Sequence, residues 1–309
     1  MNLCILGHGL PSLLLAKILS NKNIKVSIFE GYKPKNKLIT RTLGIAKYNL
    51  NYLKLEKIDL ESAWFINNIQ IFNDISKYNP TINFGSEKEK LFYIIKYNIF
   101  INLIKKNLKK NKFVKYIKRK NFIDLILNNK HNYDLIINFD QNNKISKNLF
   151  YKRITKNYNS TAFTTLIKHK KINNRIAYQV FTKLGPIAFL PCSEKETSIV
   201  YSIYKQNNDI SNKRIIDLIK KYNNKYSIKS FSKVEKFDLI GSNLRNYFYK
   251  NILCFGDNIH RIHPLAGQGL NMTIRDIQTL SELIDQKINL GLCLDKSIIK
   301  EFENKTKHF

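Results

Sequence analysis

The run CFGDNIHRIHPLAGQGLN fills residues 254–271 and decides the fold of this chain. The apolar residues 251–255 predict a buried strand, and the periodic segment at about 270–288 predicts a helix. Gly256 and Asp257 stand where the backbone must turn sharply away from the strand. A carboxylate at that position can accept hydrogen bonds from a polyol, so this run predicts a ligand site between a strand and a helix.

The second half of the run has the features of a helix start that meets a ligand. Pro264 stiffens the approach, and Gly267 and Gly269 let the main chain come close to a flat ligand, because glycine has no Cβ atom. Backbone N–H groups at the helix start can also stabilise negative charge. A Gly-Asp pair alone is equally typical of an ordinary turn, so the interpretation depends on the whole run.

The amino terminus predicts a second part of the same site. Its order is an apolar strand, a glycine turn, an apolar helix, a second strand and an acid, as in a dinucleotide-binding fold. These features fall at residues 2–6, 7–12, 13–20 and 25–29 and at Glu30. The helix start would face a pyrophosphate, and the Glu30 carboxylate would accept a hydrogen bond from a ribose hydroxyl.

The glycine turn departs from the usual fingerprint at one position. Gly7 and Gly9 occupy the first two glycine positions, but Ser12 stands where the third glycine is usual. Serine is also small, so we expect slightly looser packing of the helix on the strand and retained phosphate binding. This degenerate fingerprint is weak alone and becomes a strong indication when it is paired with the run at 254–271.

On these residues the chain resembles the FAD-dependent aromatic hydroxylases, whose motif GD-x-x-H-x-x-x-P-x-x-G-Q-G-x-N matches at each position. Among them it is most similar to the ubiquinone-biosynthesis hydroxylases, the group that includes 2-octaprenyl-6-methoxyphenol hydroxylase. The resemblance implies FAD as the cofactor, with Asp257 on the ribityl chain and the glycine-rich turn against the isoalloxazine ring. The residues of this run that the resemblance assigns to the cofactor are Gly256, Asp257, Pro264, Gly267, Gln268, Gly269, Leu270 and Asn271.

Two further segments extend the resemblance between these ends. Residues 41–46 resemble the family's R-T-x-A/G-I/L-S segment, which implies that Arg41 lies near the flavin and its phosphates. Residues 181–191 resemble the F-x-x-x-G-P-x-A-x-L-P signature of the substrate-domain sheet. Simpler interpretations stay open, because Arg41 is also compatible with a solvated surface charge and Gly185 with a plain hairpin turn.

One motif expected from the resemblance is altered. The family carries D-G-x-x-S after an apolar strand, and here residues 133–139 supply the strand and Asp140 the acid. Gln141 replaces the glycine, and Lys144 stands where the serine would be. Two interpretations of Asp140 therefore remain: a contact to the cofactor, or a strand-end aspartate that starts the following turn.

The resemblance also implies the reaction. NAD(P)H or another electron donor reduces FAD, dioxygen adds to form a C4a-hydroperoxyflavin, and the distal oxygen is transferred to the aromatic ring of a polyprenylated phenol. The flavin carries this chemistry and the protein binds, orients and excludes water, so no catalytic side chain is predicted. His260 and His263 could suggest a metal ligand pair, but no third ligand lies nearby in the sequence; we expect packing in the turn and no metal.

The predicted fold is α/β, with a Rossmann-like FAD-binding domain of the aromatic hydroxylase type and an inserted antiparallel-sheet substrate domain. Residues 1–60, 86–157 and 240–309 are assigned to the discontinuous FAD-binding domain, and residues 61–85 and 158–239 to the substrate domain. The 309 residues suffice for two cores, although the C-terminal helical portion usual in the family is expected to be missing.

The net charge of +30, from 53 basic and 23 acidic residues, raises the question of polyanionic partners. Lysine is spread through the chain with asparagine and isoleucine, and no nucleic-acid-binding signature accompanies it, so nucleic acid is not an expected partner. A peripheral contact with an anionic membrane is more plausible, because the implied substrate is a lipid. Other proteins of ubiquinone biosynthesis are further candidate partners.

The cysteine pattern bears on the cellular compartment. The four cysteines lack C-x-x-C spacing, and Cys4 and Cys254 fall in apolar strands, which predicts buried thiols in a reducing compartment. We therefore expect a cytoplasmic protein, peripheral on the inner face of the cell membrane at most.

Two other functions stay open: a non-catalytic flavin-fold subunit of a biosynthetic assembly, and a soluble hydroxylase of small aromatic acids.

Overall fold

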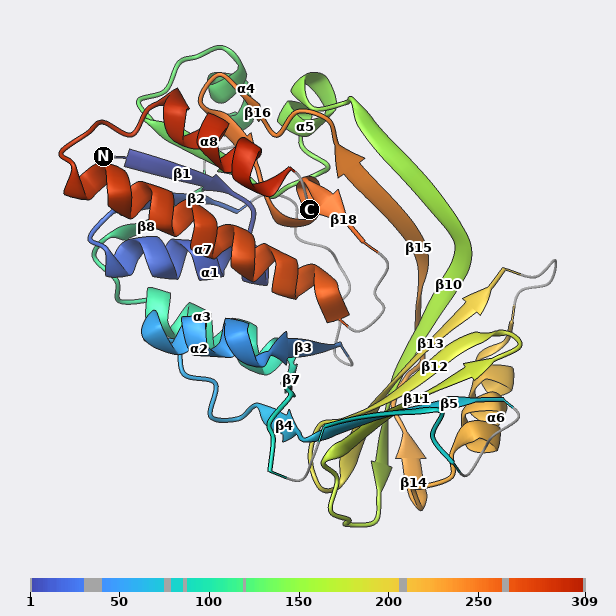
Figure 1. Ribbon diagram of the computed structural model, residues 1–309. Coiled ribbons are helices and arrows are strands. Elements are labelled where there is room, and N and C mark those ends of the chain that lie inside the picture. The colour runs from blue at the N-terminus through green and yellow to red at the C-terminus, as the bar shows by residue number, and fades with distance from the viewer. Residues whose placement is uncertain are drawn as a thin grey trace.

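The computed structural model describes residues 2–30, 41–74, 79–85, 88–118, 121–205, 210–262 and 267–307. The described chain forms an α/β unit around a parallel sheet and a second unit around a large antiparallel sheet, with a small sheet near the place where they meet (Figure 1). The predicted fold class, a Rossmann-like sheet with a large antiparallel sheet, is confirmed.

The first sheet is the dinucleotide-binding type that the amino terminus predicts. Its strands are parallel except for the edge strand β16, which pairs antiparallel with β17. In order across the sheet they are β16 (Phe248–Tyr249), β17 (Ile252–Cys254), β9 (Leu135–Asn138), β1 (Asn2–Leu6), β2 (Lys25–Phe29) and β8 (Val114–Ile117).

Helices pack against this sheet and against one another. The helices α1 (Leu10–Asn21), α3 (Tyr97–Leu108) and α7 (Gln268–Asn289) form one group, in which α1 contacts both others. The helix α8 (Lys296–Thr306) packs on α7, and the short helices α4 (Phe122–Leu127) and α5 (Lys144–Leu149) lie against each other (Figure 1).

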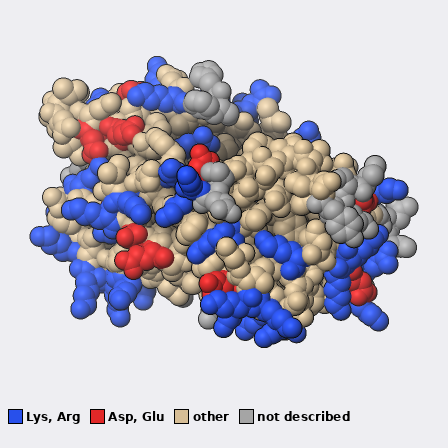
Figure 2. Space-filling model, turned by 60° about the horizontal axis from the view of Figure 1, so that its bottom comes forward, with Lys and Arg blue, Asp and Glu red and all other residues tan. Residues whose placement is uncertain are grey.

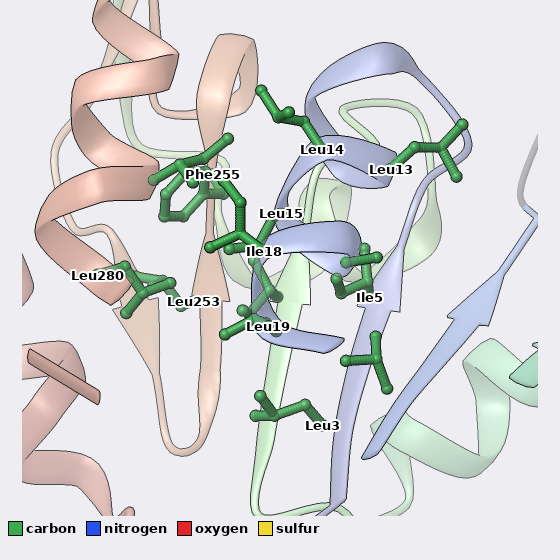
Figure 3. Close-up of a cluster of buried hydrophobic side chains, with 14 of the residues drawn as sticks. Leu3, Ile5, Leu13, Leu14, Leu15, Ile18, Leu19, Leu253, Phe255 and Leu280 are labelled. Carbon is green, nitrogen blue, oxygen red and sulfur yellow. The ribbon is translucent and has the colours of Figure 1, made fainter. Parts of the chain in front are cut away.

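The core of this unit explains why the leucine-rich segment forms α1. Leucine and isoleucine side chains cover almost the whole circumference of the helix and are fully buried, as expected for a helix enclosed by other elements. Figure 3 shows side chains of α1, β1, β17 and α7 gathered in one cluster, with Phe255 beside them. Cys4 and Cys254 lie in this core, and burial raises the pKa of both thiols.

The second sheet is antiparallel except where β11 and β5 pair in parallel. In order across it the strands are β18 (His260–Arg261), β15 (Glu235–Leu244), β10 (Arg153–His169), β13 (Glu196–Tyr204), β12 (Gly185–Pro191), β11 (Ile176–Thr182), β5 (Asn68–Asn73) and β6 (Ile82–Gly85), and β14 (Ile228–Phe231) pairs with β10. The helix α6 (Asn212–Tyr222) buries its apolar side chains against one face of this sheet.

The signature at 181–191 forms a β-hairpin of this sheet. Thr182 pairs with Gly185 across the turn between β11 and β12. Gly185 has φ +131°, and a Cβ atom there would lie 2.1 Å from the carbonyl oxygen of Ser202, so only glycine fits. The hairpin interpretation of Gly185 is therefore correct for the backbone.

A small sheet of β3 (Thr42–Ala46), β7 (Phe92–Lys96) and β4 (Trp64–Ile66) joins the two units, and α2 (Lys47–Leu55) follows β3. Lys96 pairs with Glu196 of the large sheet at 2.6 Å, and the Thr42 hydroxyl donates to Ser198 Oγ at 2.8 Å. These polar contacts tie the small sheet to β13.

The assigned domain boundaries at 157/158 and 239/240 fall inside two long strands, β10 and β15. Both strands run from the first unit into the second without a linker (Figure 1). The division into two domains stays a prediction. Among the described residues, no helix is long and apolar enough to span a membrane.

Replacement of a core leucine should destabilise the first unit. Leu253 of β17 is fully buried, so Leu253→Ala should lower the free energy of unfolding by about 2–5 kcal/mol through lost burial and a residual cavity. Leu55→Ala, at an 82% exposed position, should change it by less than about 0.5 kcal/mol. Urea titration followed by circular dichroism measures both, and equal losses would contradict the packing described here.

Candidate functional site

Three parallel strands end at the same level and place the predicted site residues together. Leu6 of β1 is in register with Asn138 of β9, and Asn138 with Cys254 of β17. The residues that follow these strand ends therefore meet at one edge of the sheet. Ligands of open α/β sheets bind outside this carboxyl edge, so the topology alone points to it.

A cavity of about 280 Å³ lies at this edge. Seven of the residues predicted from the sequence line it: Gly7, Gly9, Ser12, Arg41, Asp140, Asp257 and Leu270. Its other lining residues are His8, Leu10, Pro11, Leu43, Tyr97, Phe139 and Thr273. Segments separated by more than 200 positions in the sequence thus share one cavity.

The glycine turn is tightly packed. Gly7 has φ +138°, and a Cβ atom there would lie 3.0 Å from Phe139 Cβ, so a side chain at this position would disturb the neighbouring strand end. Ser12 is fully buried, and its hydroxyl donates to the Gly9 carbonyl at 2.8 Å. Ser12 is thus small enough for the helix-to-strand contact, and its hydroxyl has a hydrogen-bond partner.

Helix α1 begins directly at the cavity. Gly9 is its N-cap residue and provides no side chain to cap the first turn. Pro11 in the first turn has no backbone N–H, so the N–H groups of Leu10 and Ser12 are the ones that can bind an anion, and Gly9 leaves space for the anion to approach.

Glu30 follows β2 and lies beside the glycine turn. Its Oε1 is 3.4 Å from His8 Nδ1, and His8 lines the cavity, whereas Glu30 is not among the lining residues. A contact between Glu30 and a ribose hydroxyl stays a prediction. His8 was not singled out from the sequence. A residue between two glycines gives no sign that its side chain will meet Glu30, which follows the next strand.

Asp257 lies in a short 3-10 turn, η1 (Gly256–Asn258), directly after β17. Gly256 has φ +61°, a left-handed conformation that glycine accepts without strain. The turn brings the exposed Asp257 side chain to the cavity, while Gln141 Nε2 donates to the Asp257 carbonyl oxygen. The carboxylate is thus placed for a polar ligand.

Asp140 combines features of both interpretations drawn from the sequence. Its Oδ1 accepts a hydrogen bond from the Asn142 N–H at 2.8 Å, which starts the turn, and the residue also lines the cavity. Lys144, at the position of the motif's serine, instead pairs with Asp124 at 2.8 Å. A cofactor contact at Asp140 therefore remains a prediction.

A buried polar network supports the two carboxylates. Ser146 Oγ donates to the Asp140 carbonyl at 2.6 Å and accepts from Asn138 Nδ2 and Asn258 Nδ2. Arg153 Nη2 donates to Asn258 Oδ1 at 3.0 Å. Because such groups are costly to bury unpaired, this network fixes the turns that carry Asp140 and Asp257.

The distal glycine turn is held by Asn271. The Asn271 amide nitrogen donates to the Gly44 and Gly267 carbonyls, and its oxygen accepts from the Ala46 N–H and from Asn49 Nδ2. These hydrogen bonds link the start of α7 to β3. Both polar atoms of the Asn271 side chain therefore have hydrogen-bond partners within the protein. A contact between Asn271 and the cofactor stays a prediction.

The remaining residues of this turn keep the backbone accessible. Gly267 is the N-cap of α7 with φ +64°, and Gln268 is the first helical residue. A Cβ atom on Gly269 would meet nothing within 4 Å, so open space adjoins the backbone there. Pro264 and His263 lie outside the described residues.

Arg41 and His260, two further residues considered from the sequence, lie in different surroundings. Arg41 is exposed and lines the cavity, with its guanidinium 5.4 Å from the centre of the Tyr97 ring, and its role near the cofactor stays a prediction. His260 is buried, with Nε2 3.0 Å from Asp276 Oδ2, so its partner lies on α7 and not within the turn.

The described residues fit FAD. A cofactor with a pyrophosphate needs an uncapped helix start, and α1 offers one behind a glycine turn that no side chain fills. A polyol chain needs an exposed acceptor, and Asp257 provides it. Leu43, Tyr97, Phe139 and Thr273 complete the lining, and no motif marked these four because only the tertiary fold brings them to the cavity.

Comparison with known proteins agrees with this assignment. A family model described as an FAD binding domain matches residues 152–289. The chain is 26% identical over 182 residues to the mitochondrial ubiquinone biosynthesis monooxygenase COQ6 of Caenorhabditis elegans, a match that covers 44% of this chain and 40% of that protein. It is 24% identical over 147 residues to the ubiquinone hydroxylase UbiL of Rhodospirillum rubrum, covering 45% of this chain and 34% of the relative.

Solved structures share the fold over nearly the whole chain. The FAD-dependent monooxygenase PqsL of Pseudomonas aeruginosa superposes with a TM-score of 0.77 at 14% identity, covering 99% of this chain and 91% of that one. The p-nitrophenol 4-monooxygenase PnpA of Pseudomonas putida gives a TM-score of 0.73 at 12% identity, covering 98% and 86%. These likenesses establish the fold.

The fold is that of flavin-dependent monooxygenases, and a model of an FAD binding domain matches residues 152–289 within it. The chain is distantly similar to the ubiquinone biosynthesis monooxygenase COQ6 and the ubiquinone hydroxylase UbiL. The matched segments span well under half the length of these curated relatives.

Removal of the Asp257 carboxylate should weaken flavin binding. Asp257→Ala deletes the carboxylate expected to accept from a ribityl hydroxyl; one hydrogen bond to a charged group is worth about 1.5–3 kcal/mol, so the Kd for FAD should rise about ten- to a hundredfold. Quenching of FAD fluorescence on titration measures the Kd. Asp217→Ala, on the exposed face of α6, is the matched control and should bind FAD like the parent.

Removal of the Asn271 amide should loosen the distal turn. Asn271→Ala leaves the partly buried partners of the amide and the buried Asn49 unpaired, so the free energy of unfolding should fall by about 1–3 kcal/mol, measured by urea titration without FAD. Asn289→Ala, exposed at the other end of α7, should have no comparable effect. Equal stability of both variants would contradict the fastening role.

Proposed function

We propose that this protein is an FAD-dependent monooxygenase that hydroxylates the aromatic ring of a polyprenylated phenol in ubiquinone biosynthesis. The observation that carries the proposal is the single cavity shared by the glycine turn, the uncapped start of α1 and Asp257. The distant similarity to COQ6 and UbiL supports the phenol substrate and the pathway.

When bound, FAD would supply the redox chemistry, taking electrons from NAD(P)H or another donor and activating dioxygen for transfer of one oxygen atom to the ring. The N–H groups at the start of α1 would hold the pyrophosphate, Glu30 the adenosine ribose and Asp257 the ribityl chain. The other oxygen atom would leave as water. The protein's own contribution is binding, orientation and exclusion of bulk water.

The surface charge fits a peripheral contact with anionic lipid. Figure 2 shows Lys and Arg side chains spread over the visible face with few acidic ones between them, rather than gathered in one stripe. Each basic residue near an anionic membrane contributes about 1 kcal/mol to attraction, which would favour the surface where a prenylated substrate resides. A cytoplasmic protein at this surface, in contact with other proteins of the pathway, is the cellular setting that we propose.

A turnover assay tests the proposal. FAD-loaded protein, NAD(P)H and a polyprenylated phenol under ¹⁸O₂ should give a product that contains one ¹⁸O atom, detected by mass spectrometry. Asp257→Ala at limiting FAD should give correspondingly less product, and Asp217→Ala should match the parent.

Other outcomes distinguish the alternative functions. Labelled product from small aromatic acids but not from the prenylated phenol would overturn the substrate assignment. Bound FAD without product from either class, with NAD(P)H and with dithionite-reduced flavin exposed to oxygen, would favour a non-catalytic subunit.

A further inference from the structure

A buried ion pair joins the segment after Asp257 to α7. His260 of β18 and Asp276 of α7 are 9% and 7% exposed, and His260 Nε2 lies 3.0 Å from Asp276 Oδ2. Within the described residues, neither of these two atoms makes a hydrogen bond to another group. The close contact between them is therefore their polar interaction there, and loss of one side chain would leave the other buried without a partner.

His260 directly follows the turn that presents Asp257. The Ile259 N–H donates to the Gly256 carbonyl at 2.8 Å, which closes the turn around Asp257. The Ile259 carbonyl accepts from the Leu244 N–H at 2.8 Å, and β18 pairs with β15. The backbone after the turn is thus fixed to the large sheet, while the His260 side chain contacts α7.

Asp276 belongs to the helix that forms another wall of the cavity. Thr273, one helical turn before Asp276, lines the cavity together with Leu270. A Cβ atom on Gly256 would lie 3.4 Å from Thr273 Cγ2, so the turn and the helix are in direct contact. The ion pair therefore connects the wall that carries Asp257 to the wall that carries Thr273 and Leu270.

The hydrogen-bond network of Asn258 does not make this connection. Asn258 bonds to the Asn138 carbonyl and to Ser146 Oγ, and Arg153 donates to Asn258 Oδ1. These partners belong to β9, α5 and β10. Between described residues, the His260 contact is the one polar link from residues 256–261 to α7.

We propose that His260 is a positioning residue for FAD, which acts through the buried pair with Asp276 to hold the Asp257 carboxylate at a fixed distance from α7. This inference rests on the proposed function, because it requires FAD in the cavity. His260 is not among the described residues that line the cavity, so it would act through Asp257 and not by touching the cofactor. A buried pair suits this role, because other spacings of β18 and α7 would leave a polar group unpaired.

A double-mutant cycle on FAD affinity tests this role, with the Kd measured by quenching of FAD fluorescence. His260→Ala should raise the Kd about tenfold in the parent, because Asp257 loses its fixed position. In the Asp257→Ala background the same change should raise the Kd less than about twofold, because the carboxylate that the pair positions is already absent. His260→Gln, whose amide N–H can still donate to Asp276, should restore most of the affinity.

The matched control is Asp285→Asn, which removes a carboxylate of α7 that pairs with Lys22 at 2.6 Å, nearer the other end of the helix. It should bind FAD like the parent. Urea titration without FAD monitors folding, and His260→Ala should lower the midpoint equally in both backgrounds. If His260→Ala fails to fold, Asp276→Asn, which removes the charge and keeps the side-chain shape, takes its place in the cycle.

The contrary outcomes are separable. An unchanged Kd in the His260 variant, or equal increases with and without the Asp257 carboxylate, would overturn the positioning role. A parent that does not bind FAD would overturn both this role and the proposed function. The expected cycle in a parent that gives no labelled product from any phenol would refute the hydroxylase function alone. Additive effects in a parent that gives labelled product would refute the positioning role alone.

Discussion

The site depends on the parallel register of β1, β9 and β17. Because Leu6, Asn138 and Cys254 are aligned, the turns that follow these strands emerge at one edge, and their first residues are close whatever their distance in the sequence. A shift of one residue in this pairing would turn the side chains of a strand to the other face and move its turn along the edge. The fully buried core beneath this edge makes such a shift costly, so hydrophobic packing fixes where the polar residues meet.

Hydrogen bonds then fix the positions of the turns that the strand register brings together. The cluster of Asn138, Ser146 and Asn258 joins the turns after β9 and β17, while Asn271 joins the start of α7 to β3. Both sets are built largely from asparagine, which offers a donor and an acceptor on one short side chain. The asparagine-rich composition is therefore used at the two places where separate segments must be held at fixed positions beside the cavity.

The large sheet is tied to the same arrangement through the small sheet. The contacts Thr42 to Ser198 and Lys96 to Glu196 hold it against the small sheet, which covers Ala177 and Leu190 on its inner face. The continuous strands β10 and β15 reinforce this placement, because no linker allows the two units to separate there.

The sequence alone determined the elements with strong local signals. The apolar alternation and the glycines of the two motifs indicated β1, α1, β2, β17 and α7, and the family resemblance assigned Asp257 and the glycine turns to one cofactor. The tertiary structure decided what depends on contacts between distant segments: the pairing of His8 with Glu30, the use of Asn271 as a fastening, and Tyr97 and Phe139 in the cavity wall. Local sequence fixes backbone preference and periodicity, whereas proximity across the fold arises only when the cores are packed.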